Sequence, residues 1–402
     1  MKKILIIFIT IVFLAIIAFA GWYFILRDPN VPVVETIKDI LPFGEGSNAP
    51  LTTNPSTSFD STQDKPLGNS NLFRISAEPV AGAVILNKNA STAIVRYVDR
   101  ATGHIYDVNL TTLIKTKVSN QTLPKIYEAY FRPDGNVVLL RFLKDDSDTV
   151  ENISLTLTPP VMPTTLYTIT SASLRGNIGA VAVGTGNTLI YTLKDTSSIV
   201  SSAFNGTGEK TLLASPFKDW RLAIAGSALL AYPKASATAS GVVYTLGISG
   251  GGLTKVLGPL SGLTAIPGPT GNRILYSYVE NGEIRLFAKN LANKTETEIL
   301  PTTLAEKCIW SVKKIGIVFC ASPADEPEAR DLDTWYRGLT HFSDRLWQFD
   351  TNQDIAQVLV EPESTLNISI DAVDLKLSPN ENYLVFINKI DLSLWGLKIE
   401  PF

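Results

Sequence analysis

Past residue 71 the chain alternates short apolar runs with tight polar turns. The turns contain Gly, Asn or Asp, which tolerate the positive φ that a tight turn needs, and the flanking runs are β-branched or aromatic. Each such unit predicts a β-hairpin. Seven turns of this kind recur, mostly about 40 to 50 residues apart: Asn87 to Ala90, Pro133 to Asn136, Arg175 to Asn177, Gly226 to Ser227, Pro269 to Asn272, Lys313 to Gly316 and Pro379 to Asn382.

A second motif follows most of the turns and consists of an aliphatic residue, an aromatic one, any residue and a further apolar one. Its clear copies are Ile105 to Val108, Ile190 to Leu193, Val243 to Leu246, Leu346 to Phe349 and Leu394 to Leu397. A third apolar run, such as Gln357 to Leu359, precedes the next hairpin. A hairpin and two further strands make a four-stranded unit, and no segment after residue 71 shows a helical period. The pattern predicts an all-β fold of propeller blades.

Counting the units gives a seven-bladed β-propeller over residues 71–402. The last unit has residues for only three strands, whereas the first has one strand too many, at Leu72 to Ser76. We expect this strand to pair with the open edge of the last blade, because such closure removes an exposed sheet edge.

Two hairpins carry a more specific pattern. Residues 377–386, LSPNENYLVF, and 131–138, FRPDGNVV, resemble the Ser-Pro-Asp-Gly-Lys-x-Leu-x-Phe hairpin of WD40-like propellers of the TolB type. The resemblance implies the propeller fold for residues 71–402. It implies no particular activity, because propellers serve as scaffolds, binding modules and enzymes alike.

The N-terminal region contains a long apolar run. Residues 4–26 include no charged side chain, and as a helix they would span roughly 34 Å, enough to cross a bilayer core. Lys2 and Lys3 precede the run, so the positive-inside rule places the N-terminus in the cytoplasm. Residues 1–27 are therefore predicted to form a short cytoplasmic tail and a single-pass transmembrane helix. The alternative is a cleaved signal peptide, since Ala18 to Ala20 fits the small-x-small cleavage pattern.

Residues 28–70 are rich in Pro, Ser, Thr, Asn and Gly and contain few large apolar side chains. Such a composition cannot bury enough surface to fold. We expect a flexible linker that holds the propeller on the outer side of the cytoplasmic membrane, which is the periplasmic or cell-surface side.

The charge balance excludes one class of partner. The 402 residues include 35 Lys and Arg and 38 Asp and Glu, which gives a formal net charge of -3, and the basic residues form no cluster along the chain. Binding to a nucleic-acid backbone requires such a cluster. No nucleic-acid partner is therefore expected.

The two cysteines, Cys308 and Cys320, flank the turn at Lys313 to Gly316. A hairpin that turns about Lys314 places them directly opposite each other, within reach of a disulfide bond. Two alternatives stay open: a reduced, buried pair, or a register shifted by one residue that places Ala321 opposite Cys308.

An insertion at 321–343 lengthens the predicted sixth blade between its second and third strands. Loops of this length are often functional. One hypothesis is a recognition loop with exposed aromatic and charged side chains, and the other is a cap whose aromatic residues pack on the propeller rim. The binding candidates are Asp331, Asp333, Trp335, Tyr336, Arg337, His341 and Phe342.

We predict no catalytic, metal-binding or cofactor-binding residues, because His104 and His341 form no metal-binding pair and no Ser or Cys lies in a nucleophile motif. The expected function is a protein-binding or assembly scaffold, whose partners are other proteins of the cell envelope or cell-surface glycans. The alternative is a hydrolase or lyase that acts on a glycan or peptide at the central face of the propeller. A funnel lined by clustered carboxylates would favour the enzyme.

Overall fold

The computed structural model describes residues 71–89, 92–144, 149–161 and 166–399. The predicted transmembrane helix at 4–26 and the predicted linker at 28–70 lie outside these ranges. Within the described ranges, no helix has both the length and the apolar character needed to cross a membrane.

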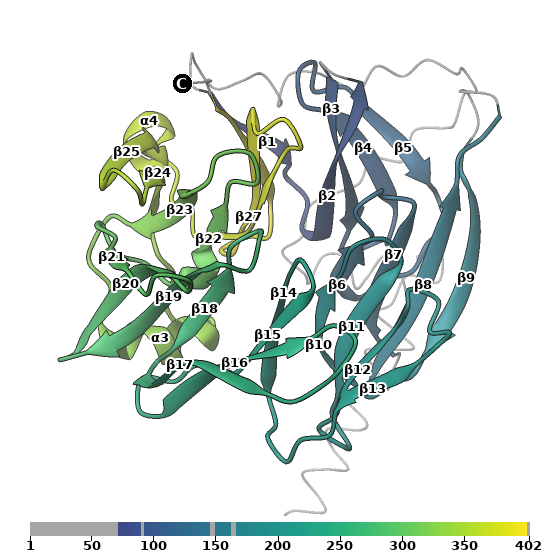
Figure 1. Ribbon diagram of the computed structural model, residues 1–402. Helices are drawn as coiled ribbons and strands as arrows, with labels where there is room; N and C mark the ends of the chain where they lie inside the picture. Colours follow the sequence, from purple (N-terminus) through teal and green to yellow (C-terminus); the bar gives the residue numbers. More distant parts are fainter. Residues whose placement is uncertain (1–70, 90–91, 145–148, 162–165, 400–402) are drawn as a thin grey trace, which may run out of the picture. The chain divides into compact units, whose positions relative to one another are not determined.

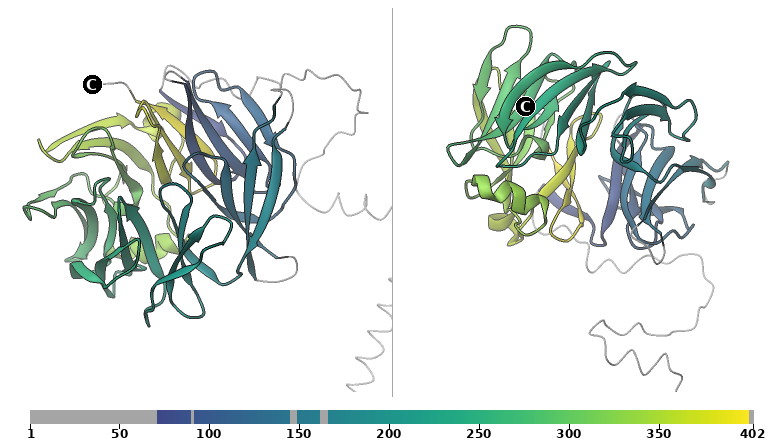
Figure 2. Two further views of the ribbon diagram at one scale, coloured as in Figure 1. Left: turned by 45° about the vertical axis from the view of Figure 1, so that its right-hand side comes forward. Right: turned by 90° about the horizontal axis from the view of Figure 1, so that it is seen from below.

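The described residues form seven antiparallel sheets of four strands each, arranged as the blades of a propeller (Figures 1 and 2). Blade 1 comprises β2 (Val80–Asn89), β3 (Thr92–Asp99), β4 (Ile105–Asn109) and β5 (Lys115–Ser119); blade 2 β6 (Ile126–Phe131), β7 (Val137–Leu143), β8 (Val150–Thr158) and β9 (Thr168–Leu174); blade 3 β10 (Ile178–Val183), β11 (Thr188–Leu193), β12 (Ile199–Ala203) and β13 (Lys210–Leu213). Blade 4 comprises β14 (Trp220–Ala225), β15 (Ala228–Pro233), β16 (Ser240–Gly247) and β17 (Thr254–Ser261); blade 5 β18 (Thr264–Pro267), β19 (Arg273–Glu280), β20 (Glu283–Asn290) and β21 (Glu296–Glu298); blade 6 β22 (Cys308–Trp310), β23 (Ile317–Pro323), β24 (Asp344–Asp350) and β25 (Ile355–Val360); blade 7 β26 (Ala372–Leu377), β27 (Tyr383–Asn388), β28 (Leu394–Lys398) and β1 (Leu72–Ser76). The predicted seven-bladed fold is thus confirmed.

The ring is closed by the first strand of the fold. β1 pairs antiparallel with β28, with Leu72 opposite Leu397 and Phe73 opposite Gly396. The N-terminal strand is therefore the outermost strand of blade 7, as the missing fourth strand of the last unit predicted.

Seven apolar clusters, one between each pair of neighbouring blades, form the core. The second strand of a blade supplies side chains to both of its neighbours. In β15, Leu229 packs toward blade 3 and Leu230 toward blade 5, because successive residues of a strand point to opposite faces. Each added blade thus brings its own interface, which lets the ring exceed the size of a single core.

Two details of the predicted repeat were wrong. The turn at Arg175 to Asn177 connects β9 to β10 between blades, and the first hairpin of blade 3 turns instead at Gly184 to Asn187. Both segments contain Gly and Asn, so turn composition alone did not distinguish them. The structure also contains the short helices α3 (Ala329–Tyr336), α4 (Pro362–Leu366) and η2 (Ala305–Lys307), where no helical segment was expected.

Candidate functional site

The predicted insertion lies between β23 and β24, and its central part forms α3. The Glu328 side chain accepts a hydrogen bond from the backbone of Asp331, and Asp331 accepts one from the Glu328 N–H, which makes a capping box. Leu332, Trp335 and Tyr336 then fall on one helical face, because residues three and four apart are neighbours in a helix.

The apolar face of α3 is buried. Leu332, Trp335 and Phe342 are 0%, 5% and 7% exposed, and they pack with Ala235 and Ile284 of neighbouring blades. Trp335 and Phe342 are therefore not the exposed contact residues that the recognition-loop hypothesis assumed. Burying large apolar side chains away from water is favourable. The insertion therefore packs on the blades as a cap on the ring.

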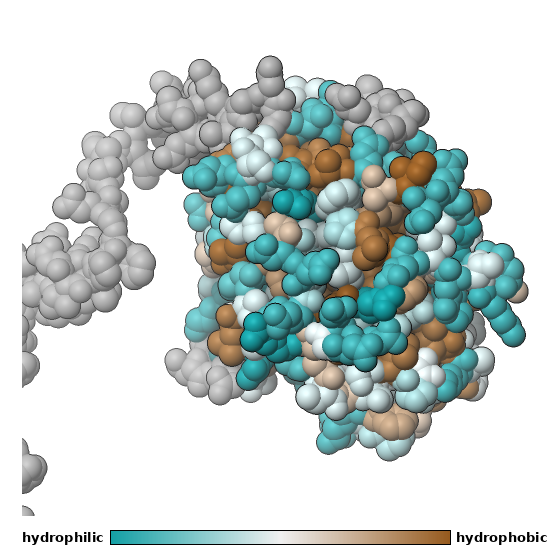
Figure 3. All heavy atoms as spheres, turned by 90° about the vertical axis from the view of Figure 1, so that its left-hand side faces the viewer, coloured by the Kyte–Doolittle hydropathy of each residue, from teal (hydrophilic) through white to brown (hydrophobic). Residues whose placement is uncertain are grey.

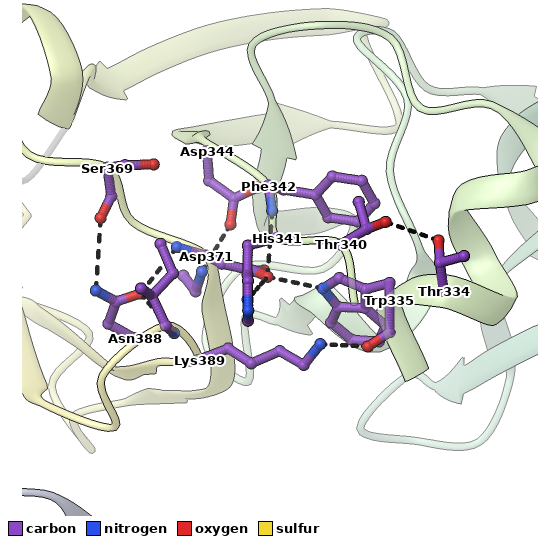
Figure 4. A network of polar contacts seen from close by, with 12 residues as sticks. Thr334, Trp335, Thr340, His341, Phe342, Asp344, Ser369, Asp371, Asn388 and Lys389 are labelled. Atoms are coloured by element: carbon purple, nitrogen blue, oxygen red, sulfur yellow. Dashed lines mark hydrogen bonds and ion pairs between the residues drawn. The ribbon is translucent and has the colours of Figure 1, made fainter. Parts of the chain in front are cut away.

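A buried ionic network holds the cap. Lys307 Nζ lies 2.8 Å from Asp344 Oδ2 and also bonds Asp371, and all three side chains are fully buried. Asp371 Oδ2 in turn accepts hydrogen bonds from Trp335 Nε1 at 2.8 Å and from the Phe342 N–H at 3.3 Å (Figure 4). Burial raises the pKa of Asp344 to about 6, although Lys307 opposes the shift.

The other predicted binding residues have separate environments. Asp333 accepts a hydrogen bond from the Ala237 N–H, and Arg337 is exposed with its Nε bonded to the Asp333 carbonyl oxygen. His341 is 39% exposed, and its Nδ1 lies 3.6 Å from Asp371 Oδ2. The seven predicted residues thus lie on one cap, yet they do not converge on one cavity.

Two adjoining cavities, of about 720 and 530 Å³, lie among the innermost strands of the blades. We call them together the central funnel, and Tyr127, Glu128, Tyr130 and Val181 line both. Cationic side chains outnumber anionic ones in the funnel wall: Arg100, Arg141, Lys194, Lys218, Arg221, Lys234 and Lys376 against Glu128, Asp219, Glu306 and Asp374. The funnel is therefore cationic in a chain of formal net charge -3.

Tyr336 links the cap to the funnel. Its hydroxyl group donates a hydrogen bond to Glu306, and its ring lies 5.9 Å from the guanidinium of Arg221 and 5.3 Å from the ammonium of Lys234. Burial raises the pKa of Glu306, while the nearby cations Arg221, Lys307, Lys234 and Lys389 oppose that shift. The C-terminal end of α3 thus lies beside Glu306, Arg221 and Lys234 of the funnel wall.

The sequence predicted that the two cysteines lie opposite each other. In the structure, Cys308 of β22 is the register partner of Cys320 of β23. Their Cα atoms are 4.1 Å apart, and their sulfur atoms are bonded. The pair lies in the apolar cluster between blades 5 and 6, so it fastens a core hairpin and takes no part in the funnel.

The sequence analysis considered a site at the central face but did not predict the charged residues of the funnel, because they come from distant segments. A signal was nevertheless available once the strands were assigned: in five of the seven blades the residue after the second strand is basic. These residues are Arg100, Lys144, Lys194, Lys234 and Lys389. Second strands all run toward the same face, and three of these residues, Arg100, Lys194 and Lys234, line the funnel.

A further groove, of about 590 Å³, lies at the outer rim between β21 and β25. Leu300 and Ile355 are 63% and 54% exposed on it. On the side of the ring that carries β21, β25 and α4, apolar side chains are scattered among polar ones (Figure 3). The residues that line this groove include four carboxylates, Glu296, Glu298, Asp350 and Asp354, and no cationic side chain, so its charge is opposite to that of the funnel.

Among the described residues, no group of three or more His, Cys, Asp or Glu side chains is arranged to hold a metal ion. His341 lies beside Asp371 and not beside Asp331 or Asp333. The polar groups of the funnel are its cations, its aromatic hydroxyl groups and the carboxyl groups of Glu128, Asp219, Glu306 and Asp374.

Comparison with known proteins supports the fold. No family model matches the chain, and no curated protein matches it. Several solved structures are similar to the chain. An oligogalacturonate lyase in complex with manganese aligns with a TM-score of 0.53 and 9% identity over 84% of this chain and 96% of that one. The oligogalacturonate lyase of Vibrio parahaemolyticus aligns with a TM-score of 0.52 and 10% identity over 84% of this chain and 96% of that one. The virginiamycin B lyase of Staphylococcus aureus aligns with a TM-score of 0.50 and 12% identity over 84% of this chain and 99% of that one. At such identities the likeness concerns the fold alone, and the TolB-type character of the hairpins stays a prediction.

Proposed function

We propose that this protein is a binding scaffold that docks an acidic segment of another cell-envelope protein in its central funnel. The observation that carries the proposal is the excess of cationic side chains in the funnel of a chain whose formal net charge is -3. Complementary charge steers a partner and fixes its orientation. A concave site with aromatic walls and a few charged groups is also the usual form of a ligand site.

The proposal includes the location. Residues 4–26 have the length and composition of a membrane helix, and residues 28–70 have the composition of a flexible tether. A propeller anchored in this way would stand outside the cytoplasmic membrane, where envelope proteins and surface glycans are within its reach.

Crosslinking in membranes tests the proposal. A photo-crosslinking residue at Phe217, which is 55% exposed on the funnel wall, should capture a partner from the full-length protein. The same residue at Lys255, on the outer strand β17 of the same blade, should capture none. The purified partner should then bind a Lys194→Glu/Lys218→Glu variant more weakly, and a Lys255→Glu variant normally. Capture from Lys255 alone would contradict the proposal.

A second candidate is a hydrolase or lyase that acts on a glycan or peptide in the same funnel. One observation favours it: burial raises the pKa of Glu306, so its carboxyl group keeps a proton to higher pH and could serve as a general acid. Turnover of an oligosaccharide or peptide by the wild-type protein, lost in Glu306→Gln, would establish this activity.

A further inference from the structure

Arg221, in the innermost strand β14, projects its side chain into the funnel wall. Its Nε atom is buried and has no hydrogen-bond partner among the described residues. The described part of the chain also offers its guanidinium no ion pair within 4 Å. Arg221 as a whole is half-buried, and its guanidinium group lies 5.9 Å from the Tyr336 ring and near enough to Glu306 to interact with its carboxyl group. A buried N–H donor that lacks a hydrogen bond, such as this Nε, is costly to the fold.

The fold satisfies the hydrogen-bonding groups of Arg96 and Arg141, which are buried. Arg96 bonds both carboxylate oxygens of Asp107, at 2.7 and 2.8 Å, and also the Gly135 carbonyl oxygen. Arg141 bonds Glu128 at 2.6 Å and the Ile178 carbonyl oxygen at 2.9 Å. The unbonded Nε of Arg221 is thus a local exception, and Arg221 lines the larger cavity of the funnel.

The surroundings of Arg221 suit one negative charge. Lys234 is exposed beside it and approaches the same Tyr336 ring. Glu306 is already engaged by the Tyr336 hydroxyl group. A carboxylate matches the planar, two-pronged donor set of a guanidinium group.

The adjoining cavity narrows the class of ligand further. Its wall carries many aliphatic side chains: Val80, Val84, Val183, Val373, Ile387 and Leu392. A ligand that fills both cavities must therefore join an acidic group to an aliphatic one. A peptide does so with neighbouring side chains, whereas a sugar ring presents hydroxyl groups around its whole edge.

We infer that Arg221, with Lys234 beside it, forms a carboxylate-binding site that takes an acidic side chain or chain end of a partner peptide, whose aliphatic neighbour enters the adjoining cavity. This inference rests on the proposed function and assigns its point of recognition. Arg221 would supply the paired hydrogen bonds, and Tyr336 would close one side of the site.

Calorimetric titration of the full-length protein in detergent tests the site. The probe is acetyl-Glu-Val-Leu-Glu, and its uncharged control is acetyl-Gln-Val-Leu-Gln-amide. The acidic peptide should bind, the control should not, and Arg221→Gln should raise the Kd about tenfold or more. Arg330→Gln, which removes a side chain 78% exposed on α3, should leave the Kd unchanged.

A second variant and two other ligands complete the titration. If Arg221→Gln does not fold, Lys234→Gln at an exposed position should still weaken the acidic peptide. Binding that is equal in wild type and both variants would overturn the site. Arg221-dependent binding of inorganic phosphate, or of a glucuronate tetrasaccharide, in place of the peptide would overturn the ligand class.

The two proposals fail separately. A partner that crosslinks from Phe217 yet binds Arg221→Gln normally would leave the scaffold intact and remove Arg221 from recognition. Arg221-dependent peptide binding without any partner captured from the funnel would do the reverse.

Discussion

Gly82 of β2 lies directly against the carbonyl oxygen of Ala129 in β6, where an added Cβ would come within 2.0 Å of that oxygen. Both strands are the innermost of their blades, and both line the funnel beside these residues. The obstacle is backbone and cannot rotate away. The contact therefore sets how closely blades 1 and 2 approach at the axis.

Gly82→Ala should lower the free energy of unfolding by about 3 kcal/mol, because the added methyl group forces two packed strands apart. Chemical denaturation followed by tryptophan fluorescence measures the loss. The matched control is Gly252→Ala, where a Cβ meets no atom within 4 Å and the change should be within about 0.5 kcal/mol. Equal effects of the two changes would show that β2 and β6 can separate freely.

The buried Asp344 should make stability depend on pH. Its pKa is raised from an ordinary value of 3.8 to about 6, so the folded state holds this proton more tightly than the unfolded chain does. The Asp344 contribution therefore favours folding at low pH, declines as pH rises from about 4 to 6, and is constant above that range.

The measurement compares wild type with Asp344→Asn, which cannot ionise. Between pH 4 and 6.5 the wild type should lose up to about 3 kcal/mol relative to the variant. Denaturation curves at several pH values within the window provide the comparison. Parallel curves for the two proteins would mean that Asp344 titrates normally in the fold.

Removing the insertion should destabilise the ring. If residues 325–341 are replaced by a short Gly-Ser turn, Leu332 and Trp335 are lost, and with Trp335 goes one hydrogen bond to the buried Asp371. Single core truncations of this size cost about 2 to 5 kcal/mol each, so a large fall in Tm is expected in a calorimetric scan. An unchanged Tm would restore the recognition-loop hypothesis.

Reduction of the Cys308–Cys320 bond should lower the free energy of unfolding by about 3 kcal/mol, because the bond closes a short loop in the unfolded chain. Denaturation with and without dithiothreitol measures the difference. The double variant Cys308→Ala/Cys320→Ala should be insensitive to the reductant. A wild-type curve that ignores dithiothreitol would show that the thiols are free in solution.

Local signals predicted most of the fold. The hairpin turns could be predicted because they contain glycines such as Gly135, Gly271 and Gly316. These residues have positive φ in the structure, a conformation that few residues other than glycine tolerate. The predicted hairpin register followed from a turn about Lys314, and it correctly set Cys308 opposite Cys320. These features depend on residues close in the chain.

Features that depend on distant contacts were not predicted. The helical spacing of Leu332, Trp335 and Tyr336 was present in the sequence, but the surface that buries it comes from other blades, including Ala235 and Ile284. The surroundings of Arg221 likewise include Glu306 and Tyr336, which lie 85 and 115 residues further along the chain. No window along the chain contains that arrangement.

The pairing of β1 with β28 also fixes the order of events during synthesis. Leu72 emerges among the first residues of the propeller, yet its partner Leu397 is made almost last. Throughout that interval β1 has no native neighbour on that edge, and a bare strand is prone to pair with other chains. The ring therefore closes in a single late step, and the time before this step is when the growing chain most needs protection from aggregation.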